Sequence, residues 1–304
     1  MNKEEQIKFI EDNYPMEKHI RSKRYMRHTF FSKIETEMQA YLLGLYASDG
    51  NINEKRKTFR IHLSYDDAYI VNYFKDIICP TARTFVIERG KQKIGRHGEI
   101  YECATTYGVD INSTTLCQDL VALGLGYRKT WAENHIPNIP KDLIPHFIRG
   151  YFDGDGCVSG YYIKPDLKYK KNERFRANFS IVSKTKSMLE DIKNELEKNN
   201  VKCNICHTNR DNMFTLSAAT SQLPKIFNYL YKNANFFMKR KYDKFNHYVN
   251  TEVTQLIAEY RNAQKVNVKE SNNPSTSAEH PKKDENVRWT SEKSEELPDK
   301  KPVG

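Results

Sequence analysis

Two copies of a ten-residue pattern lie 106 positions apart in this chain. The first spans residues 41–50 (YLLGLYASDG) and the second spans residues 147–156 (FIRGYFDGDG). Each copy is largely apolar, with a glycine six positions before its final glycine. A glycine inside a helix costs about 1 kcal/mol relative to alanine, but it lets another backbone approach closely. We therefore expect two helices that pack against each other through Gly44 and Gly150.

Both copies end in the dipeptide Asp-Gly. Gly50 and Gly156 suit the left-handed conformation that often ends a helix, which would place Asp49 and Asp155 side by side at two helix C-termini. A carboxylate there opposes the helix dipole, and a hard divalent cation such as Mg²⁺ would relieve the repulsion. A single Asp-Gly is a common turn. Two copies with matched upstream glycines favour a paired metal site.

The two copies resemble the signature of the LAGLIDADG homing endonucleases, whose single-chain members carry it twice. The resemblance covers roughly residues 37–250. The first copy has Ala47 where the signature has its earlier acidic residue, whereas the second copy keeps Asp153. The essential metal ligand of this family is the later acidic residue. The resemblance therefore implies that Asp49 and Asp155 are catalytic and bind two or more Mg²⁺ ions, with Mn²⁺ as a substitute.

The sequence after each signature helix repeats one order of elements. Residues 58–64 and 174–181 alternate between apolar and polar side chains, which predicts strands, and each is followed by helical periodicity. Further strands are predicted at 83–89, 101–106, 204–207 and 213–217, and closing helices at 116–123 and 223–230. The order is αββαββα, twice, in an α+β fold. The resemblance implies two tandem pseudo-symmetric halves with antiparallel, saddle-shaped sheets and the helix pair at their interface.

The expected organisation of the chain has five parts. These are a basic N-terminal extension (1–36), a first LAGLIDADG half (37–136), a second half (137–250), a C-terminal helix (251–264) and a disordered tail (265–304). The tail has too few large apolar residues to bury a core. The basic stretch of the extension, from Lys18 to Arg27, either contacts a phosphate backbone or forms a solvated arm.

The net charge indicates an acidic partner. The chain has 49 Lys and Arg against 39 Asp and Glu, a net charge of +10. From Lys265 onward there are eight basic and eight acidic residues, so the whole excess lies on residues 1–264. This distribution predicts nucleic-acid binding by the folded part. The resemblance points to double-stranded DNA, with intron RNA as an alternative partner.

The polar faces of the two predicted strands carry the candidate DNA-binding residues. They are Arg60 and His62 in the first strand, and Arg174, Arg176, Asn178 and Ser180 in the second. A sheet with one buried and one basic face can lie on a duplex, where cations contact phosphates and polar side chains read bases. Any antiparallel sheet also has a solvated face, which is the plainer interpretation. Because the halves differ in sequence, we expect a monomer with an asymmetric target.

Lys129 and Lys241 follow the last helix of each half, within GYRKT and FMKRKY. By resemblance, they match the lysines that this family places near its metal ions, where cations stabilise the charge that builds up at phosphorus. A lysine in this position can instead partner the carbonyls of a helix C-terminus. His62 and Ser180 are candidates for positioning the attacking water.

The cysteines and the apolar runs of the sequence indicate the cellular compartment of the protein. Cys203 and Cys206 are closely spaced, but the other four cysteines include no second close pair that would complete a zinc site. No apolar run approaches the about 20 residues of a membrane span, and no apolar signal segment opens the chain. We expect an intracellular protein without a membrane partner, in a bacterial or phage cytoplasm or in an organelle.

Three functions from different classes are consistent with these observations. The first is a site-specific DNA endonuclease that hydrolyses both strands of a long target. The second is an RNA maturase that assists splicing of a group I intron with the same basic surface. The third is a DNA-binding regulator that does not cleave. Both aspartates favour cleavage, and a measurement of activity separates the three.

Overall fold

The repeated pattern forms two helices that each begin an equivalent series of elements in a computed structural model of the protein. The structure describes residues 1–20, 23–88, 90–93, 100–127, 129, 132–165, 172–208, 212–260 and 262. The predicted tail, residues 265–304, lies outside the described residues. Among the described helices, none is both long enough and apolar enough to cross a membrane.

The predicted order αββαββα is confirmed in both repeats. The first repeat contains α2 (Glu37–Asp49), β3 (Gly50–Asn53), β4 (Thr58–Ser64), α3 (Ala68–Ile78), β5 (Thr84–Ile87), β8 (Thr106–Asn112) and α4 (Thr114–Ala122). The second contains α5 (Ile144–Asp155), β9 (Gly156–Ile163), β10 (Arg174–Ser183), α6 (Lys186–Lys198), β11 (Asn204–Thr208), β12 (Met213–Ala219) and α7 (Leu223–Tyr231). The two repeats therefore share one architecture.

Further elements precede, interrupt and follow the repeats. They are α1 (Lys3–Asn13), β1 (Glu17–Lys18), β2 (Tyr25–Met26), β6 (Lys91–Lys93), β7 (Ile100–Glu102), α8 (Lys239–Asn250) and a helical segment at residues 253–260. The single strand predicted at residues 101–106 is wrong. Its start belongs to β7, which pairs with β6, and its end belongs to β8, which pairs with β4 and β5. Strand periodicity does not reveal such a change of pairing partner.

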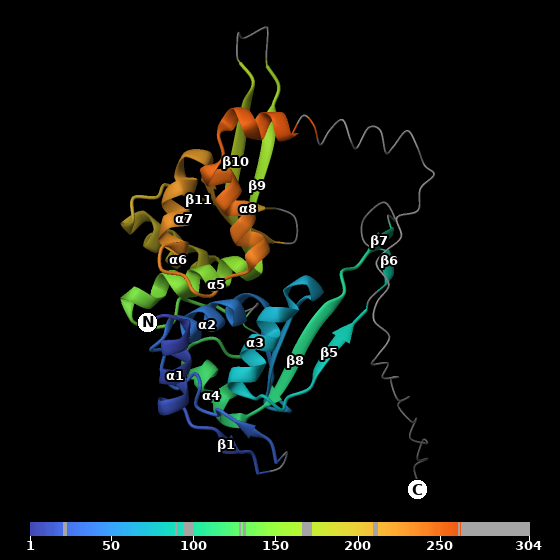
Figure 1. Ribbon diagram of the computed structural model, residues 1–304, viewed down its shortest axis with the longest axis vertical. Coiled ribbons are helices and arrows are strands. Elements are labelled where there is room, and N and C mark those ends of the chain that lie inside the picture. The colour runs from blue at the N-terminus through green and yellow to red at the C-terminus, as the bar shows by residue number, and fades with distance from the viewer. Residues whose placement is uncertain are drawn as a thin grey trace, which may run out of the picture. The chain divides into compact units, whose positions relative to one another are not determined.

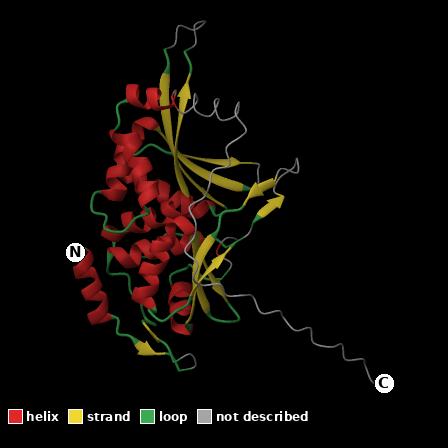
Figure 2. Cartoon of the chain, turned by 45° about the vertical axis from the view of Figure 1, so that its right-hand side comes forward, coloured by secondary structure: helices red, strands yellow, loops and turns green. Residues whose placement is uncertain are grey.

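Each repeat builds a four-stranded antiparallel sheet with the same strand order. The order is β3-β4-β8-β5 in the first sheet and β9-β10-β12-β11 in the second. In Figure 2 the strands of these two sheets lie on one side and the helices on the other. Along β4 the side chains of Phe59, Ile61 and Leu63 are buried against the helices, while Arg60 and His62 point outward. The predicted alternation is therefore confirmed, and both polar faces lie on the side away from the helices.

The helices α2 and α5 lie side by side between the two repeats (Figure 1) and pack through the predicted glycines. A Cβ atom on Gly44 would collide with the carbonyl oxygen of Phe147 and lie 2.9 Å from the backbone nitrogen of Tyr151. A Cβ atom on Gly150 would collide with the carbonyl oxygen of Tyr41 and lie 2.8 Å from the nitrogen of Leu45. The two backbones are therefore in direct contact, as the sequence predicted.

The prediction of a left-handed conformation at Gly50 and Gly156 is wrong. Both residues are extended, with φ −75° and ψ 162° at Gly50 and φ −91° and ψ 160° at Gly156. The chain passes from each helix directly into a strand, so the helices have no left-handed cap. A Cβ atom at these positions would collide with the rings of Tyr46 and Phe152, one turn earlier in each helix. Lack of space, rather than backbone freedom, explains these glycines.

The opposite end of the helix pair is held by a buried ion pair. The guanidinium of Arg149, which is completely buried, donates to Glu37 Oε1 at 2.6 Å. Glu37 also accepts hydrogen bonds from Gln6 of α1 and from the backbone of Asn235 and Phe236, which precede α8. A buried charge pair is tolerated when its remaining donors and acceptors are satisfied. This network joins α1, α2, α5 and the segment before α8.

Replacement of Gly44 by alanine should destabilise the protein, because the added methyl group pushes the two helix backbones apart. Alanine improves helix propensity by about 1 kcal/mol, but overpacking of this kind costs up to about 3 kcal/mol, so we expect a net loss of about 2 kcal/mol. Urea unfolding measures this loss. Gly126→Ala is the control, since the atom nearest its Cβ would be Val121 Cγ2 at 3.2 Å and the backbone of Val121 would lie no closer than 3.6 Å. Equal stability of the two variants would contradict the close contact.

Candidate active site at the paired helix termini

The two predicted aspartates lie together, as the last residues of α2 and α5. Gly154 leaves room for this pairing, since a Cβ atom there would lie 2.6 Å from Asp49 Oδ2 and would collide with the side chain of Ser48. Both carboxylates reach solvent. Asp49 also contributes to the raised pKa of Asp155, which shows that the two charges interact. The close contact at Gly44 and Gly150 therefore ends in two adjacent carboxylates.

Lys129 and Lys241 each bind the C-terminus of the signature helix of their own repeat. Lys129 Nζ donates to the carbonyl oxygens of Ala47 at 2.7 Å and Ser48 at 2.8 Å. Lys241 Nζ donates to three carbonyl oxygens around the end of α5: Phe152 at 3.0 Å, Gly154 at 2.9 Å and Gly156 at 2.8 Å. These contacts are the helix-terminus role considered from the sequence. They also bring both ammonium groups close enough to the aspartates to influence their pKa values.

Burial shifts the pKa of each charged group in this cluster toward its neutral form. The pKa of Asp155 is raised to about 6, first by burial and then by the charge of Asp49, while Lys129 and Lys241 oppose the rise. The pKa of Asp49 is also raised by burial. Burial lowers the pKa of Lys129 to about 8, against the attraction of both aspartates, and lowers that of Lys241. Although the aspartates are accessible to solvent, protein atoms surround them closely enough for desolvation to dominate.

The donor set at this site fits Mg²⁺. Among the residues that the structure describes, no group of three or more His, Cys, Asp and Glu could enclose a metal ion. The site therefore offers two carboxylates. Mg²⁺ typically binds one or two carboxylates and completes its shell with water and substrate phosphates. A cation between Asp49 and Asp155 would also relieve the repulsion by Asp49 that, after burial, raises the pKa of Asp155.

Asp153 has a structural role that the sequence did not reveal. It is buried, and its Oδ2 accepts hydrogen bonds from the hydroxyl of Tyr41 at 2.8 Å and from the backbone nitrogen of Met238 at 2.7 Å. Met238 immediately precedes α8, the helix that carries Lys241. The equivalent position in the first repeat is Ala47, which has no carboxylate. The two repeats therefore hold their lysines by different contacts.

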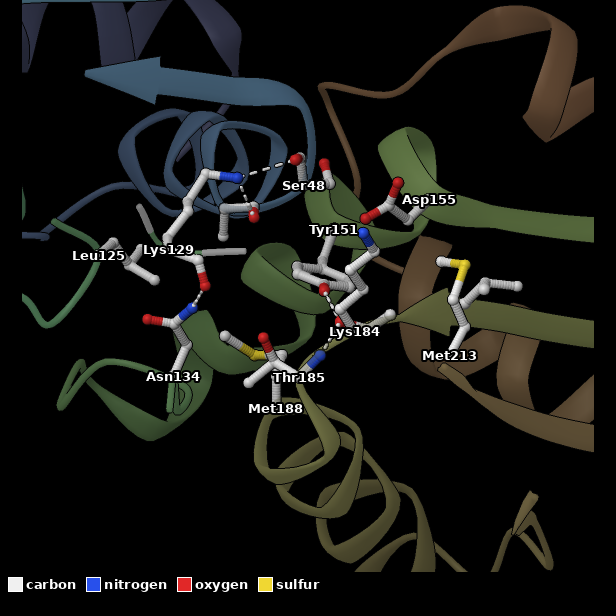
Figure 3. A pocket seen from close by; sticks show the side chains of 13 residues that line it. Ser48, Leu125, Lys129, Asn134, Tyr151, Asp155, Lys184, Thr185, Met188 and Met213 are labelled. Atoms are coloured by element: carbon white, nitrogen blue, oxygen red, sulfur yellow. Dashed lines mark hydrogen bonds between the residues drawn. The ribbon is translucent and has the colours of Figure 1, made fainter. Parts of the chain in front are cut away.

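A pocket lies beside the aspartates, between the end of α2, the end of α5 and the turn from β10 to α6 (Figure 3). Figure 3 shows Lys129 and Asp155 on opposite sides of it, with Tyr151 between them. Sequence reasoning missed Lys184 and Thr185, which line this pocket. A turn residue gives no periodic signal, so the sequence alone offers no means of assigning them to the site.

All six candidate DNA-binding residues lie on the outer faces of β4 and β10, but their surroundings differ. Arg60 and His62 both pair with Asp110 of the neighbouring strand β8, at 2.9 and 3.1 Å. The sequence analysis missed Asp110. In β10, Arg174 and Arg176 are exposed and Asn178 and Ser180 are half-buried. The proposed water-positioning pair contacts other groups here, because His62 packs edge-on against Phe85 and the hydroxyl of Ser180 donates to the carbonyl of Cys157.

The mutual influence of these charges can be measured on Asp155. In the protein without metal or DNA, its pKa should lie near 6. Asp49→Asn removes a neighbouring negative charge and should lower this pKa, whereas Lys129→Met removes a positive charge and should raise it. Titration of the side-chain carboxyl carbon by NMR measures both changes. Asp76→Asn, an exposed carboxylate on α3 paired with Lys75, is the control and should have no effect. Shifts of equal sign in the two variants would contradict the arrangement.

A family model described as LAGLIDADG endonuclease matches residues 148–251. No curated protein matches the chain. Among solved structures, the chain is similar to the meganuclease I-SmaMI bound to uncleaveable DNA, with 12% identity over 70% of this chain and 90% of that chain and a TM-score of 0.46. It is also similar to I-WcaI bound to its DNA recognition sequence (14% identity, 73% and 89% coverage, TM-score 0.45). The match to the LAGLIDADG endonuclease model therefore covers most of the second repeat, from within α5 to the end of α8.

Proposed function

We propose that the protein is a site-specific DNA endonuclease that hydrolyses both strands of a long, asymmetric target with divalent metal ions. One observation carries this proposal: each repeat supplies one aspartate and one lysine to a single cluster at the paired helix termini. Two equivalent sets of groups suit two equivalent reactions, one on each strand. The family match over residues 148–251 supports the same activity.

In this proposal, Asp49 and Asp155 hold Mg²⁺, and Mn²⁺ can substitute. Bound ions would supply the charge that activates water and stabilises the oxygens at phosphorus. The protein has to hold both carboxylates ionised beside a polyanion, although burial favours their neutral forms. Because a divalent ion competes with protons for these carboxylates, its affinity should fall below about pH 6. Lys129 and Lys241 offset part of the remaining negative charge.

The two lysines are not equally ready to contact a phosphate. A lysine ammonium group has three N–H donors. Lys129 donates two hydrogen bonds to carbonyls, so one donor remains for a phosphate oxygen. Lys241 donates three, so it has to exchange a carbonyl for a phosphate. The chemistry on the two strands would therefore begin from different arrangements.

The outer faces of the two sheets are the proposed DNA-binding surface. Arg174 and Arg176 are exposed in β10 and can reach phosphates or base edges. Arg60 and His62 are oriented by Asp110, which also partly neutralises Arg60, so they would contribute to the position and sequence specificity of the bound DNA more than to affinity. Because the two faces differ in residues and charge, the target should be asymmetric, and one chain should suffice to bind it.

The test is cleavage of a plasmid library with randomised targets in Mg²⁺. The wild type should linearise a subset of sequences, and those sequences define the target. Asp49→Asn and Asp155→Asn should each slow cleavage by about a hundredfold or more, since each removes a ligand of the catalytic ions. Binding of the selected target in EDTA should persist in both variants. Asp76→Asn is the matched control, because it removes an exposed carboxylate that pairs with Lys75 near the end of α3.

Two other outcomes would replace this proposal. Binding of a DNA site without cleavage by the wild type would favour the regulator. Binding of a structured intron RNA, with faster splicing and no cleavage of DNA, would favour the maturase. Salt dependence does not separate these functions, because each of them depends on phosphate contacts.

A further inference from the structure

Asp67 lies immediately before α3, where a helix N-cap would be, but its carboxylate does not cap that helix. An aspartate at this position normally accepts hydrogen bonds from the first turn. Here the carboxylate, in a residue that is 1% exposed, accepts three hydrogen bonds from Arg240: two from Nε at 3.1 and 2.9 Å and one from Nη2 at 2.7 Å. Asp67 belongs to the first repeat. Arg240 immediately precedes Lys241 in α8, the helix that follows the second repeat. The ion pair therefore connects the two halves of the chain.

Three consecutive residues before Lys241 are held by other elements. The backbone nitrogen of Met238 donates to Asp153, and that of Lys239 donates to the hydroxyl of Tyr69 at 2.7 Å. The side chain of Arg240 binds Asp67. Two of these three contacts come from the first repeat. Because Lys241 lies in the first turn of α8, they fix the position from which its side chain reaches the end of α5.

A related but weaker brace supports Lys129 from the second repeat. The side chain of Asn134 donates a hydrogen bond to the carbonyl of Lys129, and the carbonyl of Asn134 accepts one from Ser187 of α6 at 2.8 Å. Thr185 precedes α6 as Asp67 precedes α3, and its hydroxyl donates to the carbonyl of Ala132 at 3.5 Å. Asp67 holds Arg240 by a charged contact in which both Nε and Nη2 of a half-exposed guanidinium bind a buried carboxylate, whereas Thr185 makes a single long hydrogen bond.

We infer that each lysine is positioned by the opposite repeat, with Asp67 as the main positioning residue for Lys241. This inference rests on the proposed function for its consequence in catalysis. Each lysine lies at the end of a different signature helix, so each should serve mainly one strand. Loss of Asp67 should therefore impair the strand that depends on Lys241, although Asp67 belongs to the other repeat. A displacement of about 1 Å in a catalytic group can lower a rate about a hundredfold.

The test measures the cleavage rate of each strand on an end-labelled duplex target. Lys241→Met and Lys129→Met first show which strand depends on which lysine. Asp67→Asn keeps the size of the side chain but removes its charge, and it should slow the Lys241-dependent strand about tenfold more than the other, leaving nicked DNA. Ser187→Ala should instead slow cleavage of the Lys129-dependent strand more than that of the other strand. Asp66→Asn, an exposed neighbour, is the control and should cut both strands as the wild type does.

A double variant separates positioning from a general loss of stability. If Asp67 acts through Arg240, Asp67→Asn combined with Arg240→Met should be no slower than the more impaired single variant. A merely destabilised protein would lose both cuts together and show a lower melting temperature without a strand bias. Equal slowing of both strands by Asp67→Asn, or slowing of the Lys129-dependent strand, would overturn the inference.

A second measurement does not require cleavage. Competitive acetylation followed by peptide mass spectrometry reports the reactivity of each lysine amine. Asp67→Asn should increase the labelling of Lys241 severalfold relative to Lys129, and Ser187→Ala should do the reverse. Unchanged labelling of Lys241 in Asp67→Asn would overturn the inference even if the wild type cut DNA. If the wild type fails to cleave DNA but the variants show the expected labelling, the proposed endonuclease activity is rejected. The inference that each lysine is positioned by the opposite repeat is then retained.

Discussion

The direct contact between the backbones of α2 and α5 determines where the other parts of this structure lie. It exists because Gly44 and Gly150 have no side chain at the crossing point. Since the helices run together to their C-termini, the contact sets their last residues next to each other. Each helix continues directly into the first strand of its sheet, so the same contact also fixes the edge from which each sheet begins. A separation large enough for two methyl groups would part both the aspartates and the sheets.

This arrangement concentrates negative charge at the ends of the two helices. Two helix C-termini and two carboxylates meet in a partly desolvated space, where both aspartates favour protonation. Lys129 and Lys241 offset part of this charge by binding the terminal carbonyls, and burial weakens their own protonation in turn. The network around Glu37 and Arg149 stabilises the other end of the helix pair. The site therefore depends on packing elsewhere for its shape.

Local signals in the sequence predicted much of this fold. The alternation of Phe59, Ile61 and Leu63 with polar residues predicted β4, because a strand buried on one face has a period of two. The paired glycines predicted the helix contact, because few other constraints require glycine inside a helix. Gly50 was misread, because one residue type serves both a left-handed turn and a crowded extended position. The roles of Asp67 and Asp110 were out of reach, since their partners are remote in sequence or lie on another strand and no local pattern encodes such pairs.

The pseudo-symmetry of the backbone does not extend to the contacts that hold the lysines. Asp153 accepts a hydrogen bond from Met238 just before α8, whereas its counterpart Ala47 offers only a carbonyl to Lys129. A single chain can diverge in this way because each position is free to change in one repeat alone, which identical subunits cannot do. The lysine of the second repeat is then held firmly with all three donors engaged, while that of the first keeps a free donor beside an open pocket. Under the proposed function, one fold would thus provide two differently prepared centres, which suits an asymmetric target.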